Sequence, residues 1–232
     1  MVSQLSIIVS KELYIKDPIS SELGEKILSQ GLILMHEIGL EDFNFKKLSQ
    51  KINSTESTIY RYFESKNQFL FYLFNYYWSW MDYKLALAVA NIEDPKTRLK
   101  RAIKLVTKTV EDDLTTNYIN ENLLQQVIMV ESSKTFLSKK VDEENKLGYF
   151  KLYKNFITNL STILLEINPR YPYYSSLVST IIESVFHQRF FSQHLPKLTN
   201  NISQDEQLED FFFQLCLQTI TNYNENGKNE SF

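Results

Sequence analysis

The fold is decided near the N-terminus, by the stretch Thr58-Ile59-Tyr60-Arg61-Tyr62-Phe63-Glu64-Ser65-Lys66. Ile59 and Phe63 are one helical repeat apart, so both side chains would lie on the same face of a helix and pack inward. The polar and aromatic residues between them would remain at its rim. The stretch therefore predicts a short amphipathic helix over residues 56–62.

A second short helix is predicted just before it, over residues 45–52, with its apolar side chains inward. Only residues 53–55 separate the two helices. Asn53 suits a tight reversal, because Asn enters the left-handed region at modest cost. Thr55 suits the N-cap of the following helix. Two short helices joined in this way form a helix-turn-helix, whose second helix enters the major groove of DNA.

The side chains of the second helix suit a DNA surface. Its first turn is short and polar, so the backbone N–H groups can approach phosphates. Its rim carries phenol hydroxyls and a guanidinium, and an ammonium group opens the next helix; all of these bind phosphate oxygens. The residues concerned are Glu56, Ser57 and Thr58 on the first turn, and Tyr60, Arg61, Tyr62 and Lys66 after it.

Helical patterns continue along the rest of the chain. A first helix runs from about residue 20 and stops at Gly39, a residue that accepts positive φ. Ser65 and Gln68 form a capping box for a long helix, and Asp94-Pro95 opens the next one. Further helices are expected over residues 118–131, 135–167, 173–194 and 204–224, the last opened by a capping box at residues 203–206. We expect an all-α fold of about nine helices.

The composition agrees with a helical protein but does not favour DNA binding. There are only 5 Gly and 5 Pro, too few for a many-turned β-protein. The formal net charge is -3, whereas DNA-binding proteins are often basic; a small reading head on a large acidic body would reconcile the two. The single Cys216 is expected to be a small buried hydrophobe. With no signal peptide and no apolar run long enough to span a bilayer, we expect a cytoplasmic protein without membrane contact.

The segment that contains these two short helices resembles a known family. Residues 27–70 are similar to the DNA-binding domain of the TetR family, in which a helix ending in Gly precedes a short helix, a turn, a Ser or Thr cap and Thr-hydrophobe-Tyr-x-Tyr-Phe-x-x-Lys. The resemblance implies phosphate contacts from Tyr60 and Lys66, and base or backbone contacts from residues 55–58. The expected DNA-binding residues are then Asn44, Lys46, Thr55, Glu56, Ser57, Thr58, Tyr60, Arg61, Tyr62 and Lys66.

The chain departs from the family pattern inside the helix-turn-helix. The family usually has Ala at the position of Ser49, Gly at Asn53, Val at Ser54 and Gly at Ser57. Asn53 can still adopt the conformation of the turn, whereas Ser54 cannot make the apolar contact between the helices that Val would make. Glu56 is acidic at the end that faces DNA: it either accepts from a cytosine amino group or points away. These differences lie where the operator sequence would be read.

The charges of the head are nearly balanced. Between residues 20 and 66 the basic residues are Lys26, Lys46, Lys47, Lys51, Arg61 and Lys66, and the acidic ones are Glu22, Glu25, Glu37, Glu41, Asp42, Glu56 and Glu64. Most of the acids belong to the first helix or its exit loop. We therefore expect one head to bind DNA with modest, salt-sensitive affinity, and a dimer with two heads to bind it more tightly.

Residues 1–19 begin the chain without a clear period and are expected to form a loose arm. By the resemblance, a helix-turn-helix domain (20–66) and a ligand-binding and dimerisation domain (67–225) follow, and residues 226–232 are a tail. Aromatic residues occur on all sides of the helix that follows the head, so it should be buried on several faces. The simpler interpretation is core packing. The functional one adds that Tyr76, Tyr77 and Trp80 line a cavity for a flat or lipophilic, apolar or aromatic ligand. The last two helices would form a homodimer interface.

Two other classes of protein remain as alternatives. Glu183, His187 and His194 share a helix face and could ligate a metal in an all-helical enzyme, although neither the paired Glu-x-x-His motifs of a di-iron bundle nor a phosphate loop is present. A helical adaptor without DNA binding is the other alternative. We expect neither, and so predict a ligand-responsive regulator, a repressor that binds a palindromic double-stranded operator as a dimer, with no enzymatic activity, no metal and no cofactor.

Overall fold

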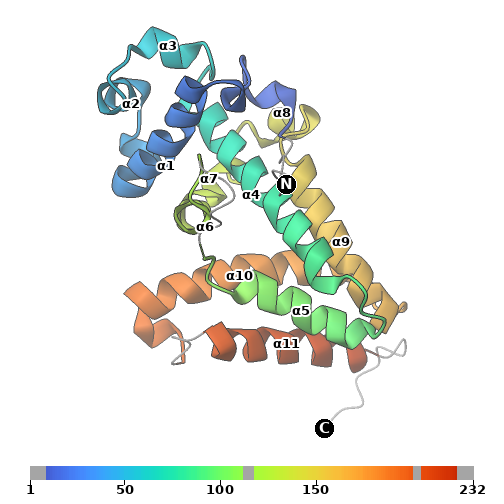
Figure 1. Ribbon diagram of the computed structural model, residues 1–232. Helices are drawn as coiled ribbons and strands as arrows, with labels where there is room; N and C mark the ends of the chain where they lie inside the picture. The colour runs from blue at the N-terminus through green and yellow to red at the C-terminus, as the bar shows by residue number, and fades with distance from the viewer. Residues whose placement is uncertain (1–8, 112–117, 201–204, 224–232) are drawn as a thin grey trace. The chain divides into compact units, whose positions relative to one another are not determined.

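The computed structural model describes residues 9–111, 118–200 and 205–223, and these residues are helical, without a strand (Figure 1). This confirms the expected all-α fold with a helix-turn-helix near the N-terminus. The described helices are α1 (Glu22–Asp42), α2 (Phe45–Lys51), α3 (Glu56–Tyr60), α4 (Lys66–Val89), α5 (Pro95–Thr107), α6 (Glu121–Glu131), α7 (Ser133–Phe136), α8 (Val141–Lys146), α9 (Lys151–Ile167), α10 (Tyr174–His194) and α11 (Asp205–Thr221), with short 3-10 turns η1 (Lys11–Leu13), η2 (Pro18–Ser20) and η3 (Pro196–Leu198).

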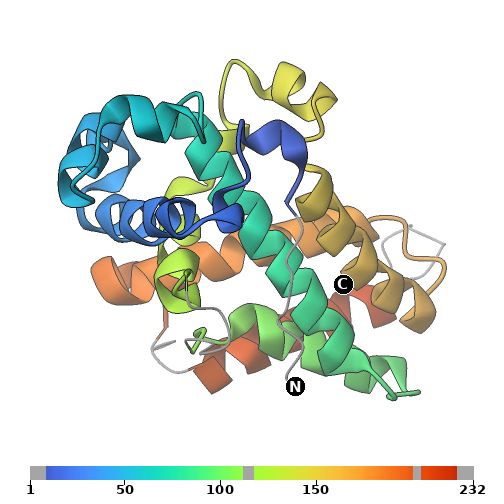
Figure 2. The same cartoon turned by 45° about the horizontal axis from the view of Figure 1, so that its top comes forward.

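Packing divides the chain into two compact units. The first contains the described part of residues 1–80 and 110–153: the N-terminal turns, α1 to α3, the first part of α4, and α6 to α8. Figure 2 shows α1, α2 and α3 grouped around the start of α4. The second contains residues 81–109 and the described part of 154–232, which include α5, α10, α11 and most of α9.

Side-chain caps start the helices of the head where the sequence predicts them. The Asn44 side chain accepts from the backbone N–H of Lys47 at 2.9 Å, and that of Thr55 accepts from Thr58 N at 3.3 Å. Asp94 caps α5 in the same way, with Pro95 at its first position. Each cap satisfies an N–H group that has no partner within its helix.

The two turns expected to need positive φ have it. Asn53 has a φ of 54°, and its backbone allows Ser54 N to donate to Ser49 O at 2.8 Å. Gly39 has a φ of 72°, although the helical segment resumes for one short stretch and α1 ends at Asp42. Ser65 caps α4 as expected, since its hydroxyl accepts from Gln68 N at 3.1 Å, but the return bond falls one residue earlier: the Gln68 amide oxygen accepts from Glu64 N at 2.7 Å.

The prediction of a single long helix over residues 135–167 is wrong. Three helices, α7, α8 and α9, occupy this span. The last break falls at Gly148, whose φ is 83° and where no atom crowds the missing Cβ. A residue at positive φ cannot continue a right-handed helix, so the chain turns there despite its helical composition. Smaller differences concern the ends of helices: α5 ends at Thr107 and α6 begins at Glu121, each a few residues short of the prediction.

The core of the first unit is built on the aromatic part of α4. Residues 68–78 of this helix are all buried, which confirms that it packs on several sides. Phe69 stacks on Phe43 with ring centroids 5.4 Å apart and contacts Phe63 edge-on at 5.1 Å. A Cβ at Gly31 would collide with the Phe69 ring, so α1 can approach α4 closely only with glycine there.

The N-terminal segment, expected as a loose arm, is docked over its described residues. Leu13 is completely buried, and Ile15 N donates to Tyr62 O at 2.8 Å. A Cβ at Gly24 would collide with the backbone of Pro18, so η2 lies directly against α1. The sequence shows no period here because the segment packs through isolated apolar residues and backbone bonds rather than through a helix face.

The second unit joins α5, α10 and α11. Arg189 on α10 donates to Asp205 at 2.8 Å and to Thr109 at 2.7 Å, and Arg98 on α5 pairs with Glu166 on α9. The described part of the last predicted helix is α11, whereas residues 203 and 204 of its expected capping box and the tail lie outside the described residues. Cys216 is buried here as expected, and burial raises the pKa of its thiol to about 12.

Candidate nucleic-acid interface

Helices α2 and α3 form the helix-turn-helix. The reversal between them is held by backbone bonds from Asn53 N to Gln50 O, at 3.2 Å, and from Ser54 N to Ser49 O. Lys26 on α1 donates to Ile52 O at 3.0 Å and so caps the end of α2. The orientation of α3 is therefore fixed by bonds on both sides of the turn.

The hydroxyl groups at the start of α3 are bonded to one another. Thr55 Oγ1 lies 2.9 Å from both Ser57 Oγ and Thr58 Oγ1, and it also accepts from Thr58 N. Thr55, Ser57 and Glu56 are exposed, and Thr58 is half-buried. The first turn of α3 therefore offers a preorganised set of hydroxyls beside one exposed carboxylate.

Tyr60 and Arg61 are placed as the sequence predicts, at an exposed rim. Tyr60 is 48% exposed, and its ring packs edge-on against Phe45 at 5.0 Å between centroids. Arg61 follows directly and is exposed, as are Asn44 and Lys46 at the start of α2. This rim presents a phenol, a guanidinium, an amide and an ammonium group, all of which can bind phosphate oxygens.

Tyr62 and Lys66 are less available than the other predicted site residues. Tyr62 is 3% exposed, and its hydroxyl lies 2.9 Å from Ser21 Oγ and 3.3 Å from Lys16 Nζ. Burial alone would raise the pKa of Tyr62, but these two hydrogen bonds, together with the positive charges of Lys16 and Arg61, outweigh it and lower the pKa. Lys66 Nζ donates to Leu40 O at 2.8 Å and Glu41 O at 2.9 Å, so it caps the end of α1. One of its three donor hydrogens remains for a phosphate.

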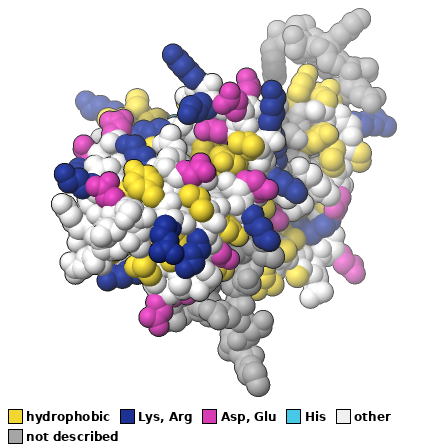
Figure 3. Space-filling model, turned by 90° about the horizontal axis from the view of Figure 1, so that it is seen from above, with side chains coloured by type: hydrophobic (Ala, Val, Ile, Leu, Met, Phe, Trp, Pro, Cys, Tyr) yellow, Lys and Arg dark blue, Asp and Glu magenta, His cyan; other side chains and the backbone are white. Residues whose placement is uncertain are grey.

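Several other lysines of the head are also occupied by protein oxygens. Lys47 donates to Asp42 O at 2.9 Å, and Lys51 pairs with Glu37 at 2.7 Å. Figure 3, the view from above Figure 1, shows basic and acidic side chains interspersed on this face rather than separated. The interface is therefore electrostatically mixed, in agreement with the balanced charge count of the head.

The three residues expected to line a ligand cavity are buried in α4. Tyr76 and Tyr77 are 1% exposed and Trp80 is 3% exposed. Tyr76 contacts the Tyr118 ring edge-on at 6.2 Å, and burial raises the pKa of its phenol well above the usual value. The structure thus brings these residues together with other aromatics in a packed core.

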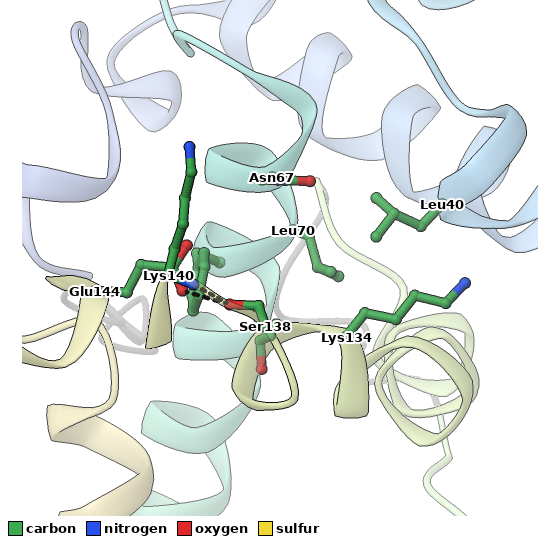
Figure 4. A pocket seen from close by; sticks show the side chains of 9 residues that line it. Leu40, Asn67, Leu70, Lys134, Ser138, Lys140 and Glu144 are labelled. Atoms are coloured by element: carbon green, nitrogen blue, oxygen red, sulfur yellow. Dashed lines mark hydrogen bonds between the residues drawn. The ribbon is translucent and has the colours of Figure 1, made fainter. Parts of the chain in front are cut away.

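A small cavity of about 60 Å³ lies elsewhere in the first unit, where α4 faces the segment between α7 and α8 (Figure 4). Figure 4 shows Ser138 pointing toward Glu144, to which it donates at 3.2 Å, and Lys134 extending away on the other side. The lining residues are Leu40, Asn67, Leu70, Phe71, Lys134, Thr135, Ser138, Lys140 and Glu144. This volume is far below the roughly 300 Å³ of a typical small-molecule site.

The histidines of α10 make ring contacts. His187 stacks on Phe191 at 6.0 Å, and His194 lies 4.5 Å from Phe190 between centroids. Among residues 9–111, 118–200 and 205–223, no three His, Cys, Asp or Glu side chains are grouped closely enough to hold a metal ion. Over the same residues, no helix is both long and apolar enough to cross a membrane.

Sequence reasoning did not find the partners that hold the interface together. Ser21 and Lys16 reach Tyr62 from the N-terminal segment, and Glu131 on α6 accepts from Leu40 N at 3.1 Å. These contacts join residues that are 41 to 91 positions apart in the chain, and no periodic pattern records them. The buried face of α6 also carries Glu121 and Gln125, so the residue type alone did not single out Glu131.

A helical head with this turn, these caps and an exposed second helix defines a helix-turn-helix DNA-binding domain. Comparison with family models identifies it: residues 27–73 match the model of the bacterial regulatory proteins of the tetR family. The expected resemblance to the TetR family is thereby confirmed over these residues. A comparison with curated proteins found no match.

Solved structures share the fold over most of the chain. AibR in complex with isovaleryl coenzyme A and operator DNA superposes with a TM-score of 0.58 at 16% identity, covering 82% of this chain and 95% of AibR. A tetR-family regulator from Shewanella sp. PV-4 gives 0.58 at 14% identity, with 84% and 96% covered. The superantigen PfiT gives 0.56 at 13% identity, with 88% and 97% covered. Proteins of different function share this fold, so the head domain is the more informative feature.

Proposed function

We propose that the protein is a ligand-responsive transcriptional repressor that binds a palindromic operator as a homodimer. The observation that carries the proposal is the helix-turn-helix itself: a turn at positive φ, capped helices and an exposed α3, in a segment that matches the TetR DNA-binding domain. Because the proposed partner is chromosomal DNA, we expect it to act in the cytoplasm.

Within the head, the exposed rim and the first turn of α3 have different roles. Asn44, Lys46, Tyr60 and Arg61 are exposed beside α2 and α3 and would bind phosphates, which sets the register on the duplex. Lys66 would donate its third hydrogen to a phosphate. Tyr62 would act indirectly, through its hydrogen bonds to Ser21 and Lys16. The first turn of α3 would enter the major groove, where Thr55, Glu56, Ser57 and Thr58 could contact base edges.

The proposed domain division follows from these roles, with an arm to residue 19, the DNA-binding head over 20–66, and a ligand-binding and dimerisation region over 67–225. Phe211 and Leu215, one helical repeat apart on α11, are 46% and 42% exposed. Exposed apolar side chains in line on a helix favour a partner surface. A two-fold dimer would present two heads to the two halves of a palindrome.

The proposed ligand is a small apolar or aromatic molecule, or one that carries an acyl chain. AibR, which has this fold, was solved with isovaleryl coenzyme A. The aromatic segment of α4 that contains Tyr76, Tyr77 and Trp80 is the corresponding candidate lining. Because these residues are buried, ligand entry would require the core around them to open, and such movement is a means of coupling a ligand to the head.

A mobility-shift experiment tests the proposal. The full chain is titrated, at low salt, against the DNA upstream of its own gene and against a pool of random duplexes from which bound sequences are selected. We expect a selected site with two-fold symmetry, released by an acyl-coenzyme A or another apolar compound. Absence of a shift with every fragment would contradict DNA binding and favour a helical adaptor or an enzyme.

A further inference from the structure

We propose that Lys16, on the docked N-terminal segment, is a phosphate-binding residue of the head and acts beside Lys46 and Arg61. This inference rests on the proposed DNA-binding function. It adds a residue that lies outside the matched segment 27–73. It also gives the docked segment a function, to hold an ammonium group at the turn between α3 and α4.

The segment is fixed to this turn at three points. Ile15 N donates to Tyr62 O at 2.8 Å, and Ser21 Oγ lies 2.9 Å from the Tyr62 hydroxyl. Gln68, in the first turn of α4, donates to Glu12 O at 3.2 Å. These contacts run along one side of residues 62–68, so the segment is positioned relative to α3 by backbone bonds and not only by its side chains.

Lys16 is held over Tyr62. Its Nζ atom lies 3.3 Å from the Tyr62 hydroxyl and 5.1 Å from the ring centroid, a cation–π distance. The side chain remains exposed. A neutral phenol orients an ammonium group without neutralising its charge, so the charge of Lys16 remains available at the surface. The residue that precedes Tyr62 is the exposed Arg61, and Tyr60 lies just before it.

The charge balance of the head makes this residue important. Four of its lysines donate to backbone carbonyls or to a carboxylate within the protein: Lys26, Lys47, Lys51 and Lys66. For Lys46 and Arg61 the described residues provide no such acceptor. With Lys16 added, three exposed cations per head donate to neither a backbone carbonyl nor a carboxylate, and the slope is calculated for these three as phosphate contacts. At roughly 0.9 counterions per phosphate contact, a dimer would show a slope of log K against log salt of about −5.

Lys11 provides a matched control. It is exposed and lies on the same segment, in η1. The backbone O of its neighbour Glu12 accepts from both Gln68 Nε2, at 3.2 Å, and the Tyr149 hydroxyl, at 3.3 Å, whereas the bonds to Tyr62 come from residues 15, 16 and 21. A general effect of removing positive charge from the segment would appear in both variants, whereas a phosphate contact would appear only in Lys16→Gln.

The experiment measures the affinity of the full-length protein for its selected operator between low and moderate salt, for wild type, Lys16→Gln, Lys16→Arg and Lys11→Gln. We expect Lys16→Gln to reduce the slope by about 2 for the dimer, with Lys16→Arg and Lys11→Gln close to wild type. Base preference, determined by selection, should not change, because phosphate contacts carry no direct sequence information.

Two results would overturn the inference, and they are distinguishable. If the wild-type protein binds no DNA, both the proposed function and this role of Lys16 are contradicted. If the wild-type protein binds DNA and the Lys16→Gln variant has the same slope of log K against log salt, only the role of Lys16 is contradicted. A weaker affinity with an unchanged slope also counts against the inference, since it would show that Lys16 supports the fold without contacting phosphate.

Discussion

At the scale of single residues, the most informative group outside the DNA surface is the carboxylate of Glu131. It is 4% exposed, accepts from Leu40 N at 3.1 Å and pairs with Lys134 at 2.8 Å. Leu40 directly follows Gly39, where positive φ interrupts α1 and frees that N–H from its helical acceptor. Glu131 therefore satisfies a backbone group that the turn exposes, and it ties α6 to the end of α1.

Replacing this carboxylate should destabilise the protein. Glu131→Ala leaves the buried Leu40 N–H without its acceptor, and we expect the free energy of unfolding to fall by about 1–3 kcal/mol. Glu131→Gln keeps an acceptor oxygen and should lose less. Urea denaturation followed by circular dichroism measures both. Equal losses in the two variants would show that the ion pair with Lys134, and not the backbone bond, is the important contact.

Tyr60 offers a residue-scale test of phosphate anchoring. Tyr60→Phe retains the ring that packs on Phe45 and removes only the exposed hydroxyl. We expect weaker binding to all DNA sequences, with the loss of about one hydrogen bond to a charged group, or 1.5–3 kcal/mol per head. Selection from a random pool should return the same site as for wild type. A changed site would mean that Tyr60 reads bases.

At the scale of elements, the sequence predicts the head better than the region behind it. The caps at Thr55 and Asp94 and the positive φ at Asn53 are local effects, so the residue type alone indicates them. The break at Gly148 was missed because a single glycine within a helical pattern does not by itself predict a stop. The docking of residues 9–20 was missed because it depends on contacts with Tyr62 and Gln68, far along the chain.

The same difference applies to the candidate site. Exposure at Tyr60 and Arg61 follows from the period of α3, whose inward face is set by Ile59. The partners of Tyr62 and Lys66 do not follow from any period, since they come from residue 21 and from the carbonyls of residues 40 and 41. Sequence reasoning therefore located the surface but overestimated how many of its cations are free.

The turn between α2 and α3 gives an element-scale prediction. Asn53 has a φ of 54°, a conformation that costs a β-branched residue about 1–2 kcal/mol or more. We expect Asn53→Val to lower the free energy of unfolding by at least that amount and to weaken operator binding, because α3 loses its fixed orientation. Asn53→Gly should retain both properties. Thermal unfolding and mobility shift measure them. Equal stability of the Val and wild-type proteins would contradict the role assigned to the turn.

At the scale of the whole molecule, the two packing units contain different parts of the proposed function. The first carries every predicted DNA contact together with α6 and its buried carboxylate, whereas the second carries the exposed apolar residues of α11. Helix α4 has residues in both units and is thus a continuous connection between the head and the proposed dimerisation region. The proposed regulator would depend on dimerisation for affinity, because few cations of each head are left without a protein acceptor.

That dependence can be tested on α11. Phe211 and Leu215 are 46% and 42% exposed, so burying the exposed half of each against a second copy would contribute roughly 0.7–1.4 kcal/mol per side chain. Changing both to Asp should shift the protein from dimer to monomer in sedimentation equilibrium, without loss of helicity. Operator binding should then weaken by at least tenfold, since the second head no longer binds as part of the same particle.

Asn155→Asp is the control: it adds an acid at an exposed position of the same packing unit, on α9 rather than on α11. It should leave the dimer intact. A double variant that remains dimeric would place the interface elsewhere. A double variant that becomes monomeric yet binds its operator as tightly as wild type would show that one head is sufficient. The few free cations counted on α2, α3 and the docked segment would then be too low an estimate of the DNA contacts.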